Sequence, residues 1–310
     1  MIELQRKLLG DKIRNEAFHR ALQRVIEKGK TTVVDVGSGT GFLAFLAARL
    51  GAKHCTLIEY GDILDTSRTL AKRNGIRNCT FIRKHSMDVK GIPPVDVMVS
   101  ETLGNYALEE NIIETIEDAK RFLVPGGTII PGIIKQFVCP VITDRLQKEI
   151  DVMADVGFDL DFAEAREICL HNIYVKTVKK EDLLAGKDVA KQWDLIDFSK
   201  KNASVRTAAV RFEPTSSVTI SGLALWWEAE LVPGVCLSTS PFEPPTHWEQ
   251  IYLPLLQAIV VKPGQTLEVV LTSDTRPKTK INLTWEARLL DTAGKPVTSQ
   301  KLDMRKGFLF

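Results

Sequence analysis

Two acidic residues, Glu101 and Glu110, stand at the ends of a ten-residue segment that directly follows a predicted buried strand. Gly104 lies between them and permits a tight loop, so the two carboxylates are expected to come close together. Like charges at short distance repel each other, and such a pair is tolerable when it receives a cation. The segment has no histidine to complete a metal site. A planar guanidinium, in contrast, can be held by two carboxylates through paired charge-assisted hydrogen bonds, so the pattern favours a guanidinium site without a metal.

A glycine-rich turn, Gly37-Ser-Gly39-Thr-Gly41, separates a predicted strand from a predicted helix. Glycine lets the backbone turn sharply and lets a ligand approach the main chain closely, while the start of the helix offers free N–H groups. Asp35 lies in the strand before the turn, and Glu59 ends the next strand. A carboxylate at that second position can accept hydrogen bonds from both ribose hydroxyls, so a nucleoside-type cofactor is expected.

The spacing of the glycines helps to choose the cofactor. Sites for NAD usually read G-x-G-x-x-G, with the helix dipole directed at a pyrophosphate. This turn reads G-x-G-x-G and is preceded by an acid. S-adenosylmethionine has no phosphate but carries an ammonium and a carboxylate, which suit an acid near the turn and a nearby cation. Arg14, on a predicted N-terminal helix, is the candidate cation.

A purely structural role, without ligand binding, is the alternative for each of these residues. In that case Glu59 would only cap the following helix, and Arg14 would be solvated on its helix face. Glu110 and its neighbour Glu109 would be first-turn acids favoured by a helix dipole. His247, which lies next to Trp248 before a predicted strand, is a candidate base or stacking platform, or a structural residue.

The elements that position these residues change character near residue 131. Before it, strands alternate with helices, which indicates parallel βαβ units. Helices are predicted over 4–28, 42–50, 63–74 and 109–122, and strands over 32–36, 54–58, 80–83, 95–100 and 128–130. In an open parallel sheet, ligands bind beyond the carboxyl ends of the strands. The glycine turn and Glu101 should therefore lie at the same edge of the sheet.

After residue 131, short alternating strands dominate and predict an all-β domain, a sandwich or a barrel. They are expected over 135–140, 173–178, 204–212, 218–230, 249–253, 266–272 and 280–289. An acidic insert, predicted to be helical over 150–169, interrupts them. The predicted fold class is α/β plus all-β: a Rossmann-type domain with an N-terminal helix over 1–131, followed by a β-barrel domain over 132–310 that contains the insert.

Composition limits the class of protein. The chain has 310 residues, is 44% hydrophobic and carries a formal charge of +2, which argues against a broad nucleic-acid footprint. Its five cysteines contain no Cys-x-x-Cys pair, which indicates neither a disulfide framework nor a zinc site and fits a reducing compartment. We find no signal peptide and no apolar stretch of membrane-spanning length. A soluble, cytoplasmic protein that contacts no membrane is expected.

Taken together, these motifs resemble the protein arginine methyltransferases, in matching order over nearly the whole chain. The resemblance is carried by the Val33–Gly41 turn, Glu59, the segment Ser100–Glu110, Thr246-His-Trp248 and the N-terminal stretch Leu8–Arg14. It implies S-adenosylmethionine as cofactor and the guanidino nitrogen of a protein arginine as methyl acceptor. Free arginine or another small guanidino compound is an alternative acceptor. A catalytically silent partner that activates a paralogue is a third possibility.

The resemblance also implies a role for each position. Arg14 would bind the cofactor carboxylate, Gly37 and its neighbours would line the methionine part, and Glu59 would hold the ribose. Ser86 and Met87 would lie beside the adenine. Substrate contacts are implied for Glu101 and Glu110 as the guanidinium clamp, for His247 paired with Asp11, and for Trp248 and Ile112 in the pocket wall.

Other implications concern assembly and product. The insert, about 150–171, matches the family's dimerisation arm, which predicts a homodimer; its exposed acids would attract Arg-rich substrates or form a solvated helix face. The tyrosine-bearing segment that covers the cofactor in relatives has no counterpart, because few residues precede Asp11. Leu8 and Ile112 occupy positions where asymmetric dimethylating members often carry methionine. The product class therefore stays open.

Overall fold

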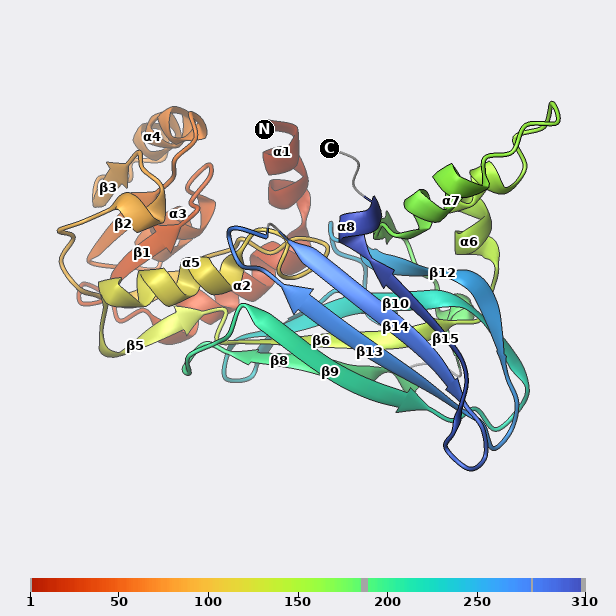
Figure 1. Cartoon of the computed structure of the whole chain (residues 1–310). Coiled ribbons are helices and arrows are strands. Elements are labelled where there is room, and N and C mark those ends of the chain that lie inside the picture. Colours follow the sequence, from red (N-terminus) through yellow and green to blue (C-terminus); the bar gives the residue numbers. More distant parts are fainter. Residues whose placement is uncertain (1, 185–188, 280, 308–310) are drawn as a thin grey trace.

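The computed structural model describes residues 2–184, 189–279 and 281–307. Its elements form two parts, a parallel sheet with helices and two antiparallel sheets (Figure 1). The first residue of the strand predicted over 280–289 and the outermost ends of both predicted domains lie outside the described residues. In the described ranges, no helix is both long and apolar enough to pass through a lipid bilayer.

The first part is a five-stranded parallel sheet in the order β3-β2-β1-β4-β5. Its strands are β1 (Thr32–Val36), β2 (His54–Ile58), β3 (Cys79–Ile82), β4 (Val95–Val99) and β5 (Leu123–Ile130). Its helices are α3 (Phe42–Arg49), α4 (Ile63–Arg73) and α5 (Ile112–Ala119), with short 3₁₀ turns over Ser86–Asp88 and Lys120–Phe122. The strand order reverses between β1 and β4, and ligands bind outside the carboxyl ends of the strands at such a switch point.

The N-terminal helix predicted over 4–28 is instead two helices, α1 (Ile2–Gly10) and α2 (Lys12–Val25). Asp11 causes the break. Its backbone is extended, with φ −81° and ψ 96°, and its Oδ1 accepts a hydrogen bond from the backbone N–H of Arg14 at 2.9 Å. A short acidic side chain that caps a new helix in this way ends the previous one. The cap fixes the first turn of α2, which carries Arg14.

The second part holds a six-stranded and a four-stranded antiparallel sheet, with orders β7-β12-β10-β6-β8 (β11 paired with β10) and β15-β14-β13-β9. The strands are β6 (Ile133–Val141), β7 (Tyr174–Lys176), β8 (Lys191–Asp197), β9 (Val205–Phe212), β10 (Val218–Val232), β11 (Val235–Ser238), β12 (Gln250–Val261), β13 (Thr266–Asp274), β14 (Asn282–Leu290) and β15 (Pro296–Asp303). The indole N–H of Trp285 joins the sheets by donating to the Pro254 carbonyl at 2.7 Å. The all-β second domain is thus confirmed, as two facing sheets.

The insert is helical only at its ends, so the continuous helix predicted over 150–169 is wrong. Helix α6 (Arg145–Ile150) and a 3₁₀ turn (Val152–Ala154) precede a loop, and α7 (Ala163–Leu170) follows it. In the loop, Asp155 accepts from the Gly157 N–H at 3.0 Å, and Phe158 has φ +59°. Aspartates that bond their local backbone compete with helix formation. Figure 1 shows the loop projecting away from both domains. A short C-terminal helix, α8 (Met304–Gly307), lies near its base.

Candidate active site

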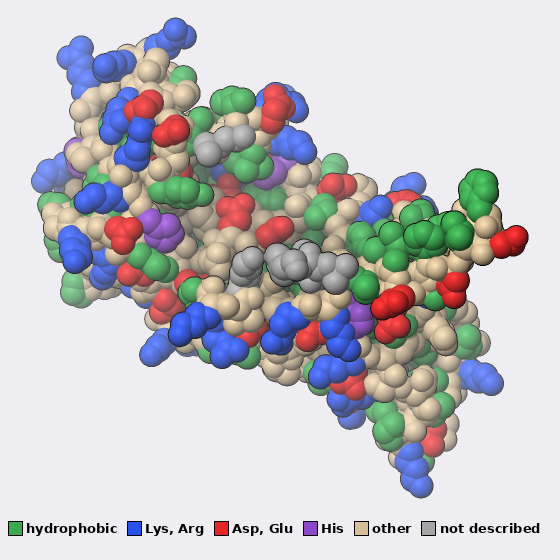
Figure 2. All heavy atoms as spheres, turned by 45° about the horizontal axis from the view of Figure 1, so that its top comes forward, with side chains coloured by type: hydrophobic (Ala, Val, Ile, Leu, Met, Phe, Trp, Pro, Cys, Tyr) green, Lys and Arg blue, Asp and Glu red, His purple; other side chains and the backbone are tan. Residues whose placement is uncertain are grey.

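A cavity of about 500 Å³ opens at the switch point of the parallel sheet. Its walls come from α1, the glycine turn after β1, the segment after β4 and the segment before β12. Figure 2 shows this face hollowed between the two parts of the molecule, with acidic side chains gathered in the hollow. Most of the predicted site residues line it, namely Arg14, Asp35, Gly37, Gly39, Glu59, Glu101, Glu110, His247 and Trp248.

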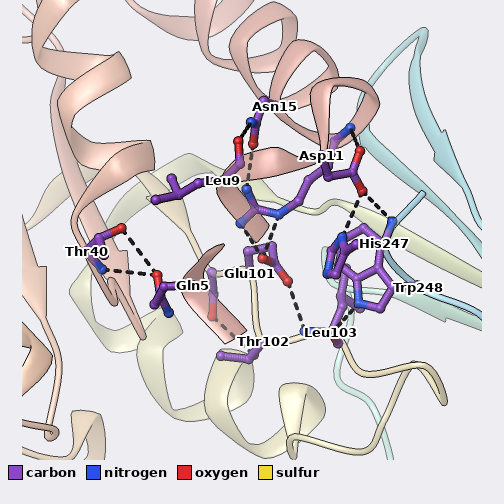
Figure 3. A network of polar contacts seen from close by, with 12 residues as sticks. Gln5, Leu9, Asp11, Asn15, Thr40, Glu101, Thr102, Leu103, His247 and Trp248 are labelled. Carbon is purple, nitrogen blue, oxygen red and sulfur yellow. Dashed lines mark hydrogen bonds and ion pairs between the residues drawn. The ribbon is translucent and has the colours of Figure 1, made fainter. Parts of the chain in front are cut away.

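The glycines of the turn are required by close packing as well as by conformation. Gly37 and Gly39 have φ of +75° and +53°, in the left-handed region that favours glycine. A Cβ on Gly37 would lie 2.9 Å from the Thr102 methyl group, and one on Gly39 would lie 2.8 Å from the Gln5 amide. Gln5 of α1 also contacts Thr40, so α1 lies across the turn (Figure 3). The backbone of the turn therefore borders the cavity with no side chain of its own at Gly37 and Gly39, while Gln5 of α1 packs against Gly39 and Thr40.

Glu59 lies at the end of β2, where the sequence placed it. Its two carboxylate oxygens accept hydrogen bonds from the backbone N–H groups of Gly39 at 3.0 Å and Gly61 at 2.8 Å. These bonds fix the carboxylate at the edge of the cavity. Each oxygen has a further lone pair, so the group can still accept two ribose hydroxyls.

Asp35 is 1% exposed and accepts a hydrogen bond from the Ala44 N–H at 3.1 Å. Burial raises the pKa of this carboxyl to about 7, and the charges of Glu59 and Glu101 act in the same direction. Asp35 therefore fixes the start of α3 while it borders the cavity. A cationic ligand group nearby would favour its ionised form.

A second cavity of about 410 Å³ shares Gly37, Glu59 and Glu110 with the first. Ser86 lines it, as expected for a residue beside the adenine. Met87 does not line either cavity and is 44% exposed. The two residues sit on a 3₁₀ turn, in which successive side chains point about 120° apart, so one inward residue excludes the next. The adenine contact predicted for Met87 is not supported.

Arg14 is a buried residue of the site and not a solvated helix residue. Its Nε donates to Glu101 Oε2 at 2.9 Å, and its Nη2 donates to the same oxygen. Its Nη1 donates to Asn15 Oδ1 at 2.9 Å. A guanidinium has five N–H donors, so two of them remain for another acceptor. Arg14 can thus hold Glu101 and a ligand carboxylate at once, a coupling that the sequence did not reveal.

Asp11 and His247 meet as the family resemblance implied, although they are far apart in the chain (Figure 3). Asp11 Oδ2 lies 2.8 Å from both the backbone N and the ring Nδ1 of His247. Burial opposes ionisation of Asp11, but hydrogen bonds from Arg14 and His247 outweigh it and lower its pKa. Burial lowers the pKa of His247 despite the pull of Asp11. At neutral pH the ring is therefore neutral, with Nδ1–H donating to Asp11 and Nε2 available to accept a proton.

Glu110 lies before α5 and not in its first turn, because the helix begins at Ile112 and Asn111, with φ +56°, is its N-cap. The structural alternative of a first-turn acid is therefore not supported. Glu110 lines both cavities and is open to solvent there, although protein atoms displace much of the water around its carboxyl group. This partial loss of water is the main cause that raises the pKa of Glu110 to about 7. Repulsion from the charges of Glu101 and Glu109 is a smaller cause in the same direction.

Ile112, predicted in the pocket wall, is fully buried in the first turn of α5 and does not line the cavity. Its helix face packs into the core, so this prediction is wrong. Leu8, the other position compared with family methionines, does line the cavity.

The segment from Glu101 to Glu110, called here the glutamate loop, is held by the β-domain. The indole N–H of Trp248 donates to the Leu103 carbonyl at 2.8 Å. The indole N–H of Trp227 donates to the Gly104 carbonyl at 3.0 Å. Sequence reasoning missed Trp227, because in an alternating strand a buried tryptophan looks like any other core residue.

Gly104 has no Cβ because there is no room for one. A Cβ there would lie 2.5 Å from Glu109 Cβ and 2.9 Å from the Tyr106 carbonyl oxygen. We therefore expect Gly104→Ala to displace the glutamate loop and to lower kcat for the reaction proposed below by about tenfold or more, since small misplacements in a site are costly. Steady-state kinetics test this. Gly132→Ala is the control, because Gly132 lies outside both cavities and a Cβ there would lie no closer than 3.6 Å to a neighbouring atom; equal kcat for the two variants would contradict the expectation.

The described residues include no group of three or more His, Cys, Asp or Glu side chains arranged to hold a metal ion. What the site does present is a carboxylate pair, a neutral histidine backed by an aspartate, and a glycine-lined backbone. This arrangement suits a cationic acceptor, proton removal and a nucleoside ligand with charged ends.

Two family models match the chain. Residues 135–288 match the arginine methyltransferase oligomerization subdomain, and residues 19–156 match the ribosomal protein L11 methyltransferase family. The two matches overlap at the start of the β-domain and together span most of the chain.

Curated relatives of the chain are named as arginine methyltransferases. The chain is 26% identical to the probable protein arginine N-methyltransferase 6 of Arabidopsis thaliana, covering 86% of this chain and 72% of that protein. It is 26% identical to the histone-arginine methyltransferase CARMER of Anopheles gambiae, over 93% of this chain and 49% of the relative. It is 30% identical to the probable protein arginine N-methyltransferase 3 of Arabidopsis thaliana, covering 85% of this chain and 48% of that protein. The chain thus spans about half of the latter two relatives.

Solved structures share the fold. The Trypanosoma brucei PRMT1 enzyme–prozyme heterotetrameric complex with AdoHcy superposes with a TM-score of 0.86 at 21% identity, covering 97% of this chain and 98% of that one. Protein arginine methyltransferase 10 of Arabidopsis thaliana superposes with a TM-score of 0.83 at 21% sequence identity, covering 98% of each chain. With the oligomerization subdomain, the curated relatives and the two-part fold in agreement, the chain belongs to the protein arginine methyltransferase family.

Proposed function

We propose that this chain transfers a methyl group from S-adenosylmethionine to the guanidino nitrogen of arginine residues in proteins. The observation that carries the proposal is the placement of Glu101 and Glu110 in one cavity with the glycine turn. The names of the relatives support the same activity. The residues fit the cofactor: a side-chain-free backbone at Gly37, a fixed carboxylate at Glu59 and two spare donors on Arg14.

The protein's part in the reaction is to orient and activate the acceptor nitrogen. Bound S-adenosylmethionine would supply a methyl group on a sulfonium. Glu101 and Glu110 would draw positive charge to two guanidinium nitrogens and leave the lone pair of the third directed at that methyl group. Such alignment can contribute roughly 7–11 kcal/mol in favourable cases. As the new C–N bond forms and the S–C bond breaks, the nitrogen becomes more acidic and must lose a proton. His247 Nε2 and the glutamate carboxylates of the clamp line the same cavity and could accept this proton.

The test uses S-adenosylmethionine labelled in its methyl group. We expect label to enter an arginine-containing peptide and not the same peptide with lysine in place of arginine. Free arginine forms a separate arm, and faster labelling there would transfer the proposal to a small guanidino substrate. Absence of label in every arm would reject the activity. Mass spectrometry of the product would also identify the degree and symmetry of methylation.

We infer that the protein acts as a homodimer joined through the arm, residues 150–171. Four apolar side chains of the arm lie in solvent in the single chain: Val152 is 65% exposed, Phe158 92%, Leu160 60% and Phe162 42%. An apolar groove of about 270 Å³ lies between α3 and α4, with Phe42, Phe45, Leu46, Leu70 and Ile76 among its lining residues. A second copy would cover both surfaces at once, because large exposed apolar patches mark protein interfaces.

Phe158→Asp should therefore convert the protein from a dimer to a monomer, because a charge at the tip of the arm would have to be buried in the partner. Light scattering coupled to gel filtration at micromolar concentration measures the mass. Val297→Asp is the matched control, since Val297 is 56% exposed but lies on β15, outside the arm. A wild-type monomer, or a dimer that survives Phe158→Asp unchanged, would refute the proposed interface.

A further inference from the structure

We propose that Trp227 is a positioning residue of the methyl-transfer site, through which the β-domain fixes the glutamate loop. The inference rests on the proposed function. Trp227 lies in β10, is 1% exposed and does not line the cavity. It would therefore act through the loop and not on the substrate.

Two indole rings hold consecutive carbonyl groups of the glutamate loop. Trp248 Nε1 donates to the Leu103 carbonyl at 2.8 Å, and Trp227 Nε1 donates to the Gly104 carbonyl at 3.0 Å. The rings pack edge to face, with centroids 4.9 Å apart and planes at 73°. A single bond would leave the loop free to pivot. Two bonds to neighbouring carbonyls fix the two successive peptide planes that flank the Cα of Gly104.

Gly104, between these two peptide planes, is the point from which both glutamates are positioned. On one side, the Leu103 N–H reaches the Glu101 carboxylate at 3.4 Å. On the other side, the Glu109 side chain packs directly over the Cα of Gly104, where a Cβ would lie 2.5 Å from Glu109 Cβ. Glu110 follows immediately. A shift of Gly104 would therefore be passed to both ends of the clamp.

Trp227 is itself well fixed, so it can serve as a reference point for the loop. Its backbone N–H donates to Thr239 Oγ1 at 3.1 Å, and its carbonyl accepts from the same hydroxyl at 3.1 Å. In the sheet it pairs with Gln136 of β6. Because β10 is bonded on both sides, the ring cannot easily follow a moving loop, and the loop must conform to the ring.

The neighbouring Trp226 provides a matched control. It lies on the same strand and is also buried, at 4% exposed. Its ring stacks on Phe137 at a centroid distance of 6.1 Å and meets Phe242 edge to face, within the β-domain. Trp226→Phe and Trp227→Phe therefore remove the same atoms from the same strand, but only Trp227→Phe removes a donor to the glutamate loop.

We expect Trp227→Phe to lower kcat for peptide methylation by about threefold to tenfold, the range that one buried hydrogen bond corresponds to. The affinity for S-adenosylhomocysteine, measured by calorimetry, should stay within about twofold of wild type, because the substitution removes none of the groups proposed to hold the cofactor. Trp226→Phe should match Trp227→Phe in loss of Tm but keep the wild-type kcat. Amide hydrogen exchange over residues 101–110 should accelerate in Trp227→Phe only.

A Trp227→Phe enzyme with the kcat and loop exchange of Trp226→Phe would overturn the inference, since the role would then be core packing alone. Should Trp227→Phe fail to fold, Trp227→Tyr retains more ring volume and is measured in the same way. Wild-type protein that methylates no guanidine would reject the proposed function separately, whereas the exchange comparison would still decide whether Trp227 holds the loop.

Discussion

Replacing Glu101 with glutamine is expected to lower kcat for methyl transfer by about a hundredfold to a thousandfold, the usual cost of losing one charge-stabilising group in a buried site. The amide is nearly isosteric but cannot balance the charge of a substrate guanidinium. Arg14, whose side chain is 6% exposed, would also lose its carboxylate partner. The guanidinium of Arg14, with its unused donors and its unbalanced charge, would then bind the cofactor carboxylate more strongly. We therefore expect S-adenosylhomocysteine to bind Glu101→Gln as tightly as wild type, or more tightly, by calorimetry.

Glu117→Gln is the control for charge removal. Glu117 pairs with Lys120 at 2.7 Å, is also partly buried, and lies outside both cavities. Its substitution should leave kcat within about twofold of wild type, as is typical of ion pairs away from a site. Undiminished turnover by Glu101→Gln would exclude the clamp. A large loss of cofactor affinity would instead show that Glu101 holds Arg14 in place for the cofactor.

The edge of the sheet at which the site forms could be predicted from sequence because it depends on strand order. Alternating strands and helices place Gly37, Glu59 and Glu101 at the ends of three parallel strands, and these ends meet at one edge. The structure places all three there. The pairing of Asp11 with His247 was also correct, but it came from the family resemblance, since nothing local links residues 236 positions apart.

Other features depend on contacts that a single sequence does not encode locally. The bond from Trp227 to Gly104 joins two domains, and the sharing of Arg14 between Glu101 and a ligand depends on where α2 crosses the loop. Met87 and Ile112 were misplaced because a small rotation of a short helix decides which side chain faces a cavity. The continuous helix predicted for the insert was wrong for a different reason. Aspartates of the insert accept hydrogen bonds from the local backbone, and these bonds interrupt the regular helix that its composition suggests.

The activity should depend on pH through Glu110, whose raised pKa of about 7 places its titration in the neutral range. Below pH 7 the carboxyl is protonated and cannot balance a guanidinium charge; above pH 7 it is ionised and can. We therefore expect kcat/KM for peptide to rise with pH, from about a tenth of its plateau one unit below that pKa to a constant value above pH 8. The pKa of His247 is lowered, so its protonation would affect the profile only at more acidic pH.

A bound guanidinium would stabilise the Glu110 carboxylate and lower its pKa in the complex. The rise in kcat, which reports the enzyme–substrate complex, should therefore occur at lower pH than the rise in kcat/KM. Asp35 also has a pKa raised to about 7, so Glu110→Gln is needed to assign the profile. That variant should lose about a hundredfold in kcat/KM and the rise near pH 7 together. A rise that persists in Glu110→Gln would assign the titration to Asp35, and hence to cofactor binding instead of the guanidinium clamp.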